Sequence, residues 1–236
     1  MIQPSYLAIV PARSGSKRLP GKNLIDFGGK PLIAWSVEAA KSSRYINEVL
    51  VSTDSVDIAN AAISAGARFE ELRKPALATD TVPLIDVVAD ILQKRGNMPD
   101  FVVLLQPTSP LRTGKHIDEA IEVMGDQDAV ISVTKLDKPN EWSNTLPPDM
   151  SLAGFMAPSV QNRQSQDLSS RYALNGAIYV VRTERLLAER RFMLRNKIVA
   201  YEMSADVSVD IDTKLDLLVA KGLYLGLDCA IARLES

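Results

Sequence analysis

The chain has 236 residues, a hydrophobic fraction of 46%, a charged fraction of 24% and a net charge of −2. This length can bury a full core in one large domain, and the near-neutral balance excludes the broad basic field of a nucleic-acid binder. The single cysteine, Cys229, excludes an internal disulfide, and the single histidine, His116, argues against histidine-based catalysis and structural zinc. Without a signal peptide or a long apolar span, we expect a cytoplasmic protein with no membrane or nucleic-acid partner.

The first predicted strand, Leu7–Val10, ends at Pro11 and leads into a loop rich in glycine and cations. Gly15 and Gly21 allow a left-handed backbone and a close approach to a ligand. The four cations are Arg13, Lys17, Arg18 and Lys22. Backbone amides in such a loop form an anion-binding concavity to which the cations add charge, so the loop predicts a polyphosphate site. The alternative is a solvated basic loop, which is disfavoured because the loop follows the first strand of an α/β pattern.

The loop matches neither of two familiar phosphate motifs. A Walker loop has four residues between its glycines and a metal-binding hydroxyl after its lysine. In this chain five residues separate Gly15 from Gly21, and Asn23 follows Lys22. The dinucleotide fingerprint Gly-x-Gly-x-x-Gly is also absent from this turn. Both of these loop classes are therefore excluded.

The first half of the chain alternates between strands and helices. Apolar spacing predicts strands over 49–51, 67–69, 101–105 and 129–133 and helices over 32–40, 56–65, 83–94 and 117–124. This alternation predicts a parallel sheet with right-handed crossovers. Because ligands of such sheets bind at the carboxyl ends of strands, we expect Gln106, Ser109 and Arg112 to face the same crevice as the opening loop. A proline-bracketed turn is the alternative for these residues.

The second half contains a long irregular segment, residues 135–175. It is rich in prolines and polar residues and is too long for a simple connection, so we predict an excursion from the sheet. It is either a disordered lid or an arm that packs on another subunit. Further strands are predicted over 175–181 and 198–201, and the arginine-rich segment 182–197 is interpreted as a solvated helix face and loop.

Ser208–Asp212 is the second predicted chemical centre. In an extended conformation Val209 and Ile211 point inward, while Asp210 and Asp212 point outward together. Neighbouring carboxylates repel each other unless a cation lies between them, and Mg²⁺ commonly bridges carboxylates and phosphates. The alternative is that Asp212 or Thr213 only caps the terminal helix, predicted over 213–226. Capping needs one of these residues and does not explain both aspartates.

Five blocks, in order along the chain, resemble those of the acylneuraminate cytidylyltransferases, the CMP-sialic acid synthetases. The blocks are residues 12–23, 51–54, 104–112, 175–179 and 208–212. The resemblance implies a single nucleotidyltransferase domain over 1–236, with a Rossmann-like α/β fold whose mostly parallel sheet is flanked by helices. It also implies a homodimer, with residues 135–175 as a dimerisation arm inserted in the second half and reaching into the partner's site.

The implied reaction transfers CMP from CTP to the 2-hydroxyl of a nonulosonic acid such as N-acetylneuraminic or legionaminic acid, with Mg²⁺ or Mn²⁺ as cofactor. By position, the resemblance places the nucleotide at Ala12, Arg13, Ser16, Lys17, Lys22, Asn23 and Arg73. Of these, Arg13, Lys17 and Lys22 would hold the triphosphate, and Asn23 and Arg73 would lie at the cytosine. The acceptor sugar is placed at Gln106 and Tyr179, with Arg163 and Arg171 as further candidates, and the metal at Asp210 and Asp212. The implied catalytic residues are Arg13, Lys22, Asp210 and Asp212.

The arm departs from the pattern of the family. Pro139–Asn144 contains no basic residue where family members often have a lysine or arginine, and Ala173 and Leu174 precede Asn175 in place of an arginine. These positions are expected to meet the acceptor's carboxylate across the dimer. The acceptor therefore stays open between sialic acid, its relatives and another 2-keto sugar acid such as pseudaminic acid or Kdo. A non-catalytic nucleotide-sugar binding protein is a further alternative, against which the acidic pair argues.

Overall fold

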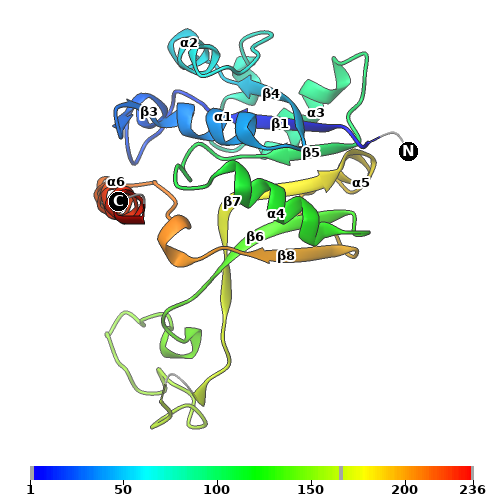
Figure 1. Ribbon diagram of the computed structural model, residues 1–236. Coiled ribbons are helices and arrows are strands. Elements are labelled where there is room, and N and C mark those ends of the chain that lie inside the picture. The colour runs from blue at the N-terminus through cyan, green and yellow to red at the C-terminus, as the bar shows by residue number, and fades with distance from the viewer. Residues whose placement is uncertain (1–2, 165–166, 235–236) are drawn as a thin grey trace.

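The structure, a computed structural model, describes residues 3–164 and 167–234, with side chains described as far as residue 226; Cys229 lies beyond them. The main strands are β1 (Tyr6–Pro11), β4 (Ile46–Ser52), β5 (Phe101–Leu104), β6 (Ala129–Lys135), β7 (Tyr172–Arg182) and β8 (Ile198–Glu202). They form one sheet in the order β4-β1-β5-β7-β6-β8 (Figure 1). Neighbouring strands pair in parallel except that β7 is antiparallel to β5 and β6. The prediction of a mostly parallel sheet is confirmed.

Alternate residues of the strands enter two hydrophobic cores on opposite faces of the sheet. In β1, Ala8 and Val10 lie in one core, and Leu7 and Ile9 lie in the other. Such a strand is buried on both faces and therefore reads as a continuous apolar run. The helices on the first face are α1 (Leu32–Ser42), α2 (Val56–Ser64) and α4 (Gly114–Met124), and those on the second are α3 (Leu84–Gln93) and α5 (Thr183–Glu189) (Figure 1). The result is a three-layer α/β/α domain.

Two helices begin at capping groups visible in the sequence. Ser55 accepts a hydrogen bond from the backbone N–H of Ile58 at the start of α2. Thr113 and His116 form a reciprocal capping box at the start of α4, which gives the single histidine a structural role. The terminal helix α6 (Lys214–Leu234) is longer than predicted. Across the described residues, no helix is both long and apolar enough to cross a bilayer.

Two sequence interpretations need correction. The predicted strand 67–69 is only a single parallel bridge between Arg68 and Leu50 at the edge of the sheet, because the chain turns to exposed glutamates directly afterwards. The arginine-rich segment is also more than a solvated face. Arg182 and Arg185 donate to Asp128 at 2.7 and 2.6 Å. Burial of Asp128 would raise the pKa of its carboxyl, but the two guanidinium groups outweigh burial and hold that pKa below its usual range.

The segment 136–171 leaves the sheet between β6 and β7 and hangs below it as a separate projection (Figure 1). It contains the short helical turn η3 (Asn140–Trp142), and its residues 165 and 166 lie outside the described part of the chain. The predicted excursion is confirmed as a projection. Large apolar side chains on it, Trp142, Leu146, Met150 and Leu152, are exposed in the single chain. Its role in dimerisation stays a prediction.

A small hairpin of β2 (Asp26–Phe27) and β3 (Lys30–Pro31) holds α6 beside the opening loop. The rings of Phe27, Trp35 and Tyr224 have centroids 5.1 to 5.6 Å apart. Gly28, between the two strands, has φ +60°, and a Cβ there would lie 2.9 Å from the Tyr224 ring. Only glycine permits both the turn and the contact. This packing fixes the helix that follows Asp212.

Candidate active site

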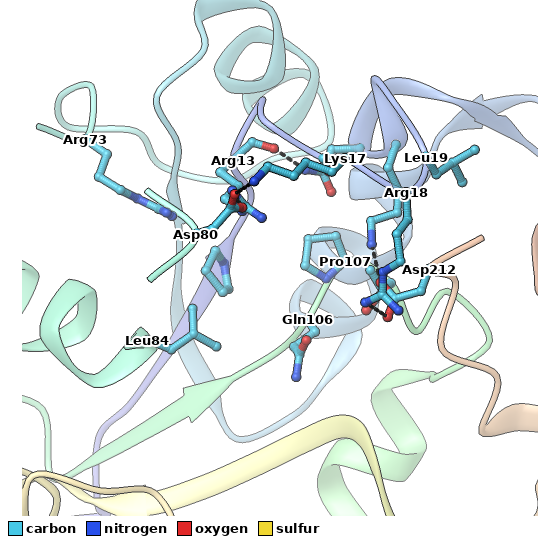
Figure 2. A pocket seen from close by; sticks show the side chains of 15 residues that line it. Arg13, Lys17, Arg18, Leu19, Arg73, Asp80, Leu84, Gln106, Pro107 and Asp212 are labelled. Carbon is cyan, nitrogen blue, oxygen red and sulfur yellow. Dashed lines mark hydrogen bonds and ion pairs between the residues drawn. The ribbon is translucent and has the colours of Figure 1, made fainter. Parts of the chain in front are cut away.

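A cavity of about 400 Å³ opens at the carboxyl ends of β1 and β5 (Figure 2). Its wall is formed by the opening loop, the segment from Arg73 to Leu84, the turn 106–108 after β5, and Asp212. This is the crevice in which ligands of open α/β sheets bind. The predicted site residues that line it are Arg13, Ser16, Lys17, Lys22, Asn23, Arg73, Gln106 and Asp212. Residues separated by up to 200 positions in the sequence therefore meet as expected.

The opening loop has a fixed backbone. Asn23 is 6% exposed, and its Nδ2 donates to the carbonyl of Arg13 at 2.9 Å. Asp54, just after β4, accepts from the backbone N–H and the hydroxyl of Ser14 at 2.7 and 2.8 Å. Gly21 has φ +67° and starts the helical turn η1 (Lys22–Leu24), a left-handed position that favours glycine. The loop thus presents its cations from a preorganised frame.

Ala12 and Arg73 meet at the end of β4. The N–H of Ala12 donates to the carbonyl of Ser52 at 2.9 Å, so this amide is committed within the protein. Arg73 binds the carbonyl and the hydroxyl of the same Ser52 at 2.6 and 3.2 Å. Burial lowers the pKa of Arg73, Asp54 opposes this shift and the charge of Arg13 adds to it. Arg73 is therefore a partly desolvated, oriented guanidinium at the cavity wall.

Two carboxylates divide the four loop cations between them (Figure 2). Asp212 binds Lys22 at 2.8 Å and Arg18 at 2.6 Å, whereas Asp80 binds the other two. The side chain of Lys22 is 12% exposed and that of Arg18 is 68% exposed. Because each loop cation already has an acidic partner, an anionic ligand has to compete with both carboxylates.

The segment Asp210–Asp212 is an irregular loop rather than the extended strand considered from the sequence. Ile211 is fully buried and donates its N–H to the carbonyl of Thr108 at 2.8 Å, which fixes the segment against the turn after β5. The cap of α6 is made by Thr213 and Asp216, each of which accepts from the other's backbone N–H. The side chain of Asp212 is therefore not used for capping and faces the loop cations instead.

Asp210 and Asp212 form a like-charged pair. Burial raises the pKa of Asp210, a hydrogen bond from Thr108 opposes this shift, the charge of Asp212 raises the pKa further and Lys22 lowers it. Such a pair is stabilised by a hard divalent cation, which prefers carboxylate oxygen. Within the described residues no group of three acidic, histidine or cysteine side chains forms a metal cage. This carboxylate pair is what the predicted metal position offers to such a cation.

Two of the predicted blocks meet beside Asp210. Gly176 in β7 has φ +74°, and a Cβ there would lie 3.3 Å from Nε2 of Gln106 and 3.9 Å from Oδ2 of Asp210. Glycine thus lets the backbone of β7 approach both side chains. Tyr179, farther along β7, packs against Phe192 with ring centroids 5.8 Å apart and does not line the cavity. Burial raises the pKa of Tyr179, and the charge of Asp210 adds to the shift.

The turn after β5 overturns the expectation that Ser109 and Arg112 face the crevice. Ser109 is fully buried, and Arg112 is 2% exposed. The Arg112 guanidinium donates to the carbonyls of Ala177 and Gln106 at 2.9 and 3.3 Å and to the hydroxyl of Ser36 at 2.5 Å. The turn places these side chains in the protein interior, where buried carbonyl groups need hydrogen-bond donors. Burial lowers the pKa of Arg112 to about 9, so it stays charged at neutral pH. Arg112 thus links the backbone carbonyl of Gln106 to that of Ala177 in β7.

Arg163 and Arg171 lie on the arm and not at the cavity of their own chain. Arg171 donates to Glu141 at 2.6 Å, and Arg163 donates to the carbonyl of Asp167. A contact between either arginine and an acceptor would have to come from the arm of another subunit. That contact stays a prediction.

Among the residues of the cavity wall that were not singled out from the sequence are Asp80, Leu84 and Thr108. Thr108 lies inside the block 104–112, so the resemblance of this block to the family already indicated its position. Asp80 lies in a proline-broken polar loop, and a lone acidic residue in such a loop carries no pattern. Its pairing with cations 63 and 67 residues away depends on the tertiary fold.

Comparison with known proteins identifies the family. The model of the cytidylyltransferase family matches residues 7–224. The chain is 37% identical to the CMP-N,N'-diacetyllegionaminic acid synthase of Legionella pneumophila, over 92% of this chain and 95% of that protein. It is 36% identical to the N-acylneuraminate cytidylyltransferase of Streptococcus agalactiae serotype V, over 98% of this chain and 55% of that protein. The chain thus spans about half the length of the streptococcal relative. This chain belongs to the cytidylyltransferase family.

The cytidylyltransferase also has a close structural relative. A solved structure of CMP:2-keto-3-deoxy-manno-octonic acid synthetase complexed with CTP matches it with a TM-score of 0.68 and 19% sequence identity, over 94% of this chain and 99% of that chain. At this identity the likeness shows the fold alone, and it confirms the predicted Rossmann-like α/β class. The predicted family and the assignment as a nucleotidyltransferase enzyme are confirmed by the family match and the sequence relatives. The roles of individual site residues stay predictions.

Proposed function

We propose that this cytidylyltransferase transfers CMP from CTP to the 2-hydroxyl of a nonulosonic acid, N-acetylneuraminic acid or a relative such as legionaminic acid, and releases pyrophosphate. The observation that carries the proposal is the cavity in which a fixed cationic loop faces Asp212, with the like-charged Asp210 two residues before it. The names of the two sequence relatives support the nucleotide and the class of acceptor.

In the proposed mechanism the loop binds the triphosphate, and the rest of the cavity orients the two reactants. Arg13, Lys17 and Lys22 leave their carboxylate partners and bind phosphate oxygens, where they neutralise the charge that develops as pyrophosphate leaves. Asn23 and Arg73 lie on the side of the cavity proposed for the cytosine. The acceptor hydroxyl then attacks the α-phosphorus in line, from the side formed by Gln106.

Asp210 and Asp212 would hold Mg²⁺ or Mn²⁺ in this proposal. The cation, when bound, supplies Lewis-acid stabilisation of phosphate charge. The contribution of the chain is the orientation of the two carboxylates. Ile211 anchors them against Thr108, and the Thr213–Asp216 cap leaves Asp212 free to face the phosphate loop.

Pyrophosphate release with a panel of acceptors tests the function. We expect release only with CTP, a divalent cation and one of N-acetylneuraminate or legionaminate; pseudaminate and Kdo represent the rival 2-keto sugar acids, and ATP, GTP and UTP are the nucleotide controls. Release with Kdo or pseudaminate alone would replace the proposed acceptor. Silence across the panel from folded protein that binds CTP would favour a binding protein without catalysis.

We further propose that the protein is a homodimer whose arm, residues 135–175, completes the partner's acceptor site. The exposed apolar side chains on the arm support this proposal. Light scattering is expected to give a dimer. Mixing two inactive variants, Lys22→Met in the loop and Arg163→Ala/Arg171→Ala on the arm, is expected to restore part of the activity, because one site of each mixed dimer is intact. A fully active monomer, or no recovery on mixing, contradicts a shared site.

A further inference from the structure

Asp80 occupies a position in the cavity that no catalytic role explains. It lies in the loop 78–83, between the helical turn η2 (Pro75–Leu77) and α3. One of its carboxylate oxygens binds Nη1 of Arg13, and the other binds Nζ of Lys17 at 2.5 Å (Figure 2). Each oxygen thus serves a different cation. A phosphate group placed between the same two side chains would make the same pair of contacts.

The charges around Asp80 favour this carboxylate as the resident anion of the loop. Among the side chains that the structure describes, those of residues 3–164 and 167–226, Arg13 and Lys17 have no acidic partner besides Asp80. Hydrogen bonds from Lys17 and from Arg13 hold the pKa of Asp80 below its usual range, so it is fully charged at neutral pH. The partners of Asp212 are the other two cations, so the two acids neutralise separate halves of the loop.

The loop that carries Asp80 is attached at both ends. The N–H of Ala78 bonds to the carbonyl of Pro75, and the N–H of Asp86 bonds to that of Pro83. Asp80 lies between these anchors, and its side chain is 36% exposed. Its ion pairs with the opening loop can therefore be exchanged for water without unfolding α3.

We propose that Asp80 is a specificity-determining residue: an internal counter-ion that holds Arg13 and Lys17 until a polyphosphate displaces it. A triphosphate or pyrophosphate carries several negative charges and outcompetes one carboxylate, whereas a nucleoside monophosphate gains less from the exchange. The cost of displacing Asp80 therefore falls on every anion that binds Arg13 and Lys17, and only an anion that binds the two cations more strongly than this carboxylate does overcomes it. The identity of the nucleotide in this inference rests on the proposed function. The competition between Asp80 and a polyphosphate rests on the ion pairs of Asp80 alone.

Calorimetric titration of Asp80→Asn with inorganic pyrophosphate, CTP and CMP tests the inference. Removing the charge of a partly exposed residue frees both cations without cutting into the core. We expect pyrophosphate to bind about 3- to 10-fold more tightly, the size that two partly exposed ion pairs carry. CTP, whose phosphates are proposed to use the same two cations, is expected to gain by a similar factor, CMP is expected to gain no more than CTP, and the gain is expected to shrink as the salt concentration rises. Asp86→Asn is the matched control, because Asp86 lies in the first turn of α3 and pairs with Arg190; its affinities should be unchanged.

The sign of the change decides between competition and positioning. If Asp80 only orients the two cations, Asp80→Asn binds pyrophosphate more weakly than the wild type, and the inference is overturned. It is also overturned if affinities are unchanged or if neither protein binds pyrophosphate. If Asp80→Asn binds pyrophosphate more tightly while the acceptor panel stays silent, the counter-ion role stands and only the proposed function fails.

Discussion

Asp212→Asn is expected to lower kcat/KM for CMP transfer by about 10²- to 10³-fold while the protein stays folded, because the substitution removes one of two carboxylates proposed to hold the divalent cation against the phosphates. The amide keeps the shape of the side chain but loses its charge. Asp210→Asn is expected to behave in the same way. The two losses should be strongly non-additive in the double variant, since one remaining carboxylate does not hold the cation.

The cost to stability should be small. Asp212→Asn breaks the exposed ion pair with Arg18, which carries about 1 kcal/mol or less, and leaves the enclosed Lys22 beside an amide oxygen that still accepts its hydrogen bond. Each kcal/mol lost corresponds to about 2 to 4 °C in Tm in a domain of this size. The backbone anchor at Ile211 and the helix cap at Thr213 are unchanged.

Three measurements separate a metal role from a structural one: steady-state rates against Mg²⁺ concentration, direct Mn²⁺ binding, and thermal unfolding. Asp206→Asn is the matched control, because it makes the same change at an exposed position four residues before Asp210. The control should keep wild-type rates and Mn²⁺ affinity in the presence of CTP. An Asp212→Asn enzyme with activity within about threefold of the wild type, a change no larger than a surface ion pair accounts for, would remove the proposed metal role.

The fold followed from local patterns in the sequence because those patterns have local causes. The run Leu7–Val10 is apolar on both faces, and only a central strand of a covered sheet requires this. Ser55 caps α2 through a hydrogen bond to the third residue after it, a contact that neighbouring residues determine. The strand prediction over 67–69 was wrong at the sheet edge, where a segment of only two apolar residues around Arg68 has no second neighbouring strand to pair with.

Site residues could be predicted only where several charged residues of one kind stand close together in the sequence. The loop cations and the acidic pair carry charge that a folded chain must neutralise, and the structure brings Lys22 and Asp212 together across 190 residues. Arg112 shows the limit of this reasoning. Its charge suggested a ligand, but its guanidinium satisfies buried carbonyls of β7 and of the turn after β5. Sequence spacing does not determine whether the side chain of an arginine at a strand end enters the crevice or is buried in the protein interior.

Lys22→Met is expected to lower kcat/KM by about 10²- to 10³-fold, the loss typical of removing one preorganised charge from a transition state. Lys22 is the enclosed cation of the loop: its side chain is 12% exposed, and its Nζ lies 2.8 Å from Asp212. A cation in such a site acts through a lower effective dielectric than one in water, so its interaction with a phosphate oxygen is stronger. Methionine keeps most of the length of the lysine side chain and removes its charge and its hydrogen-bond donors.

Arg18→Gln supplies the matched control, because Arg18 pairs with the same carboxylate from a position that is 68% exposed. Solvent and salt screen this cation, so its loss should change kcat/KM by about threefold or less. Measuring both variants at low and high ionic strength separates the two kinds of charge. The Lys22→Met defect should persist in salt, whereas any Arg18→Gln defect should disappear. Equal, salt-sensitive losses in the two variants would mean that the loop acts as a diffuse basic field, and the assignment of Lys22 as an individually positioned catalytic cation would then be wrong.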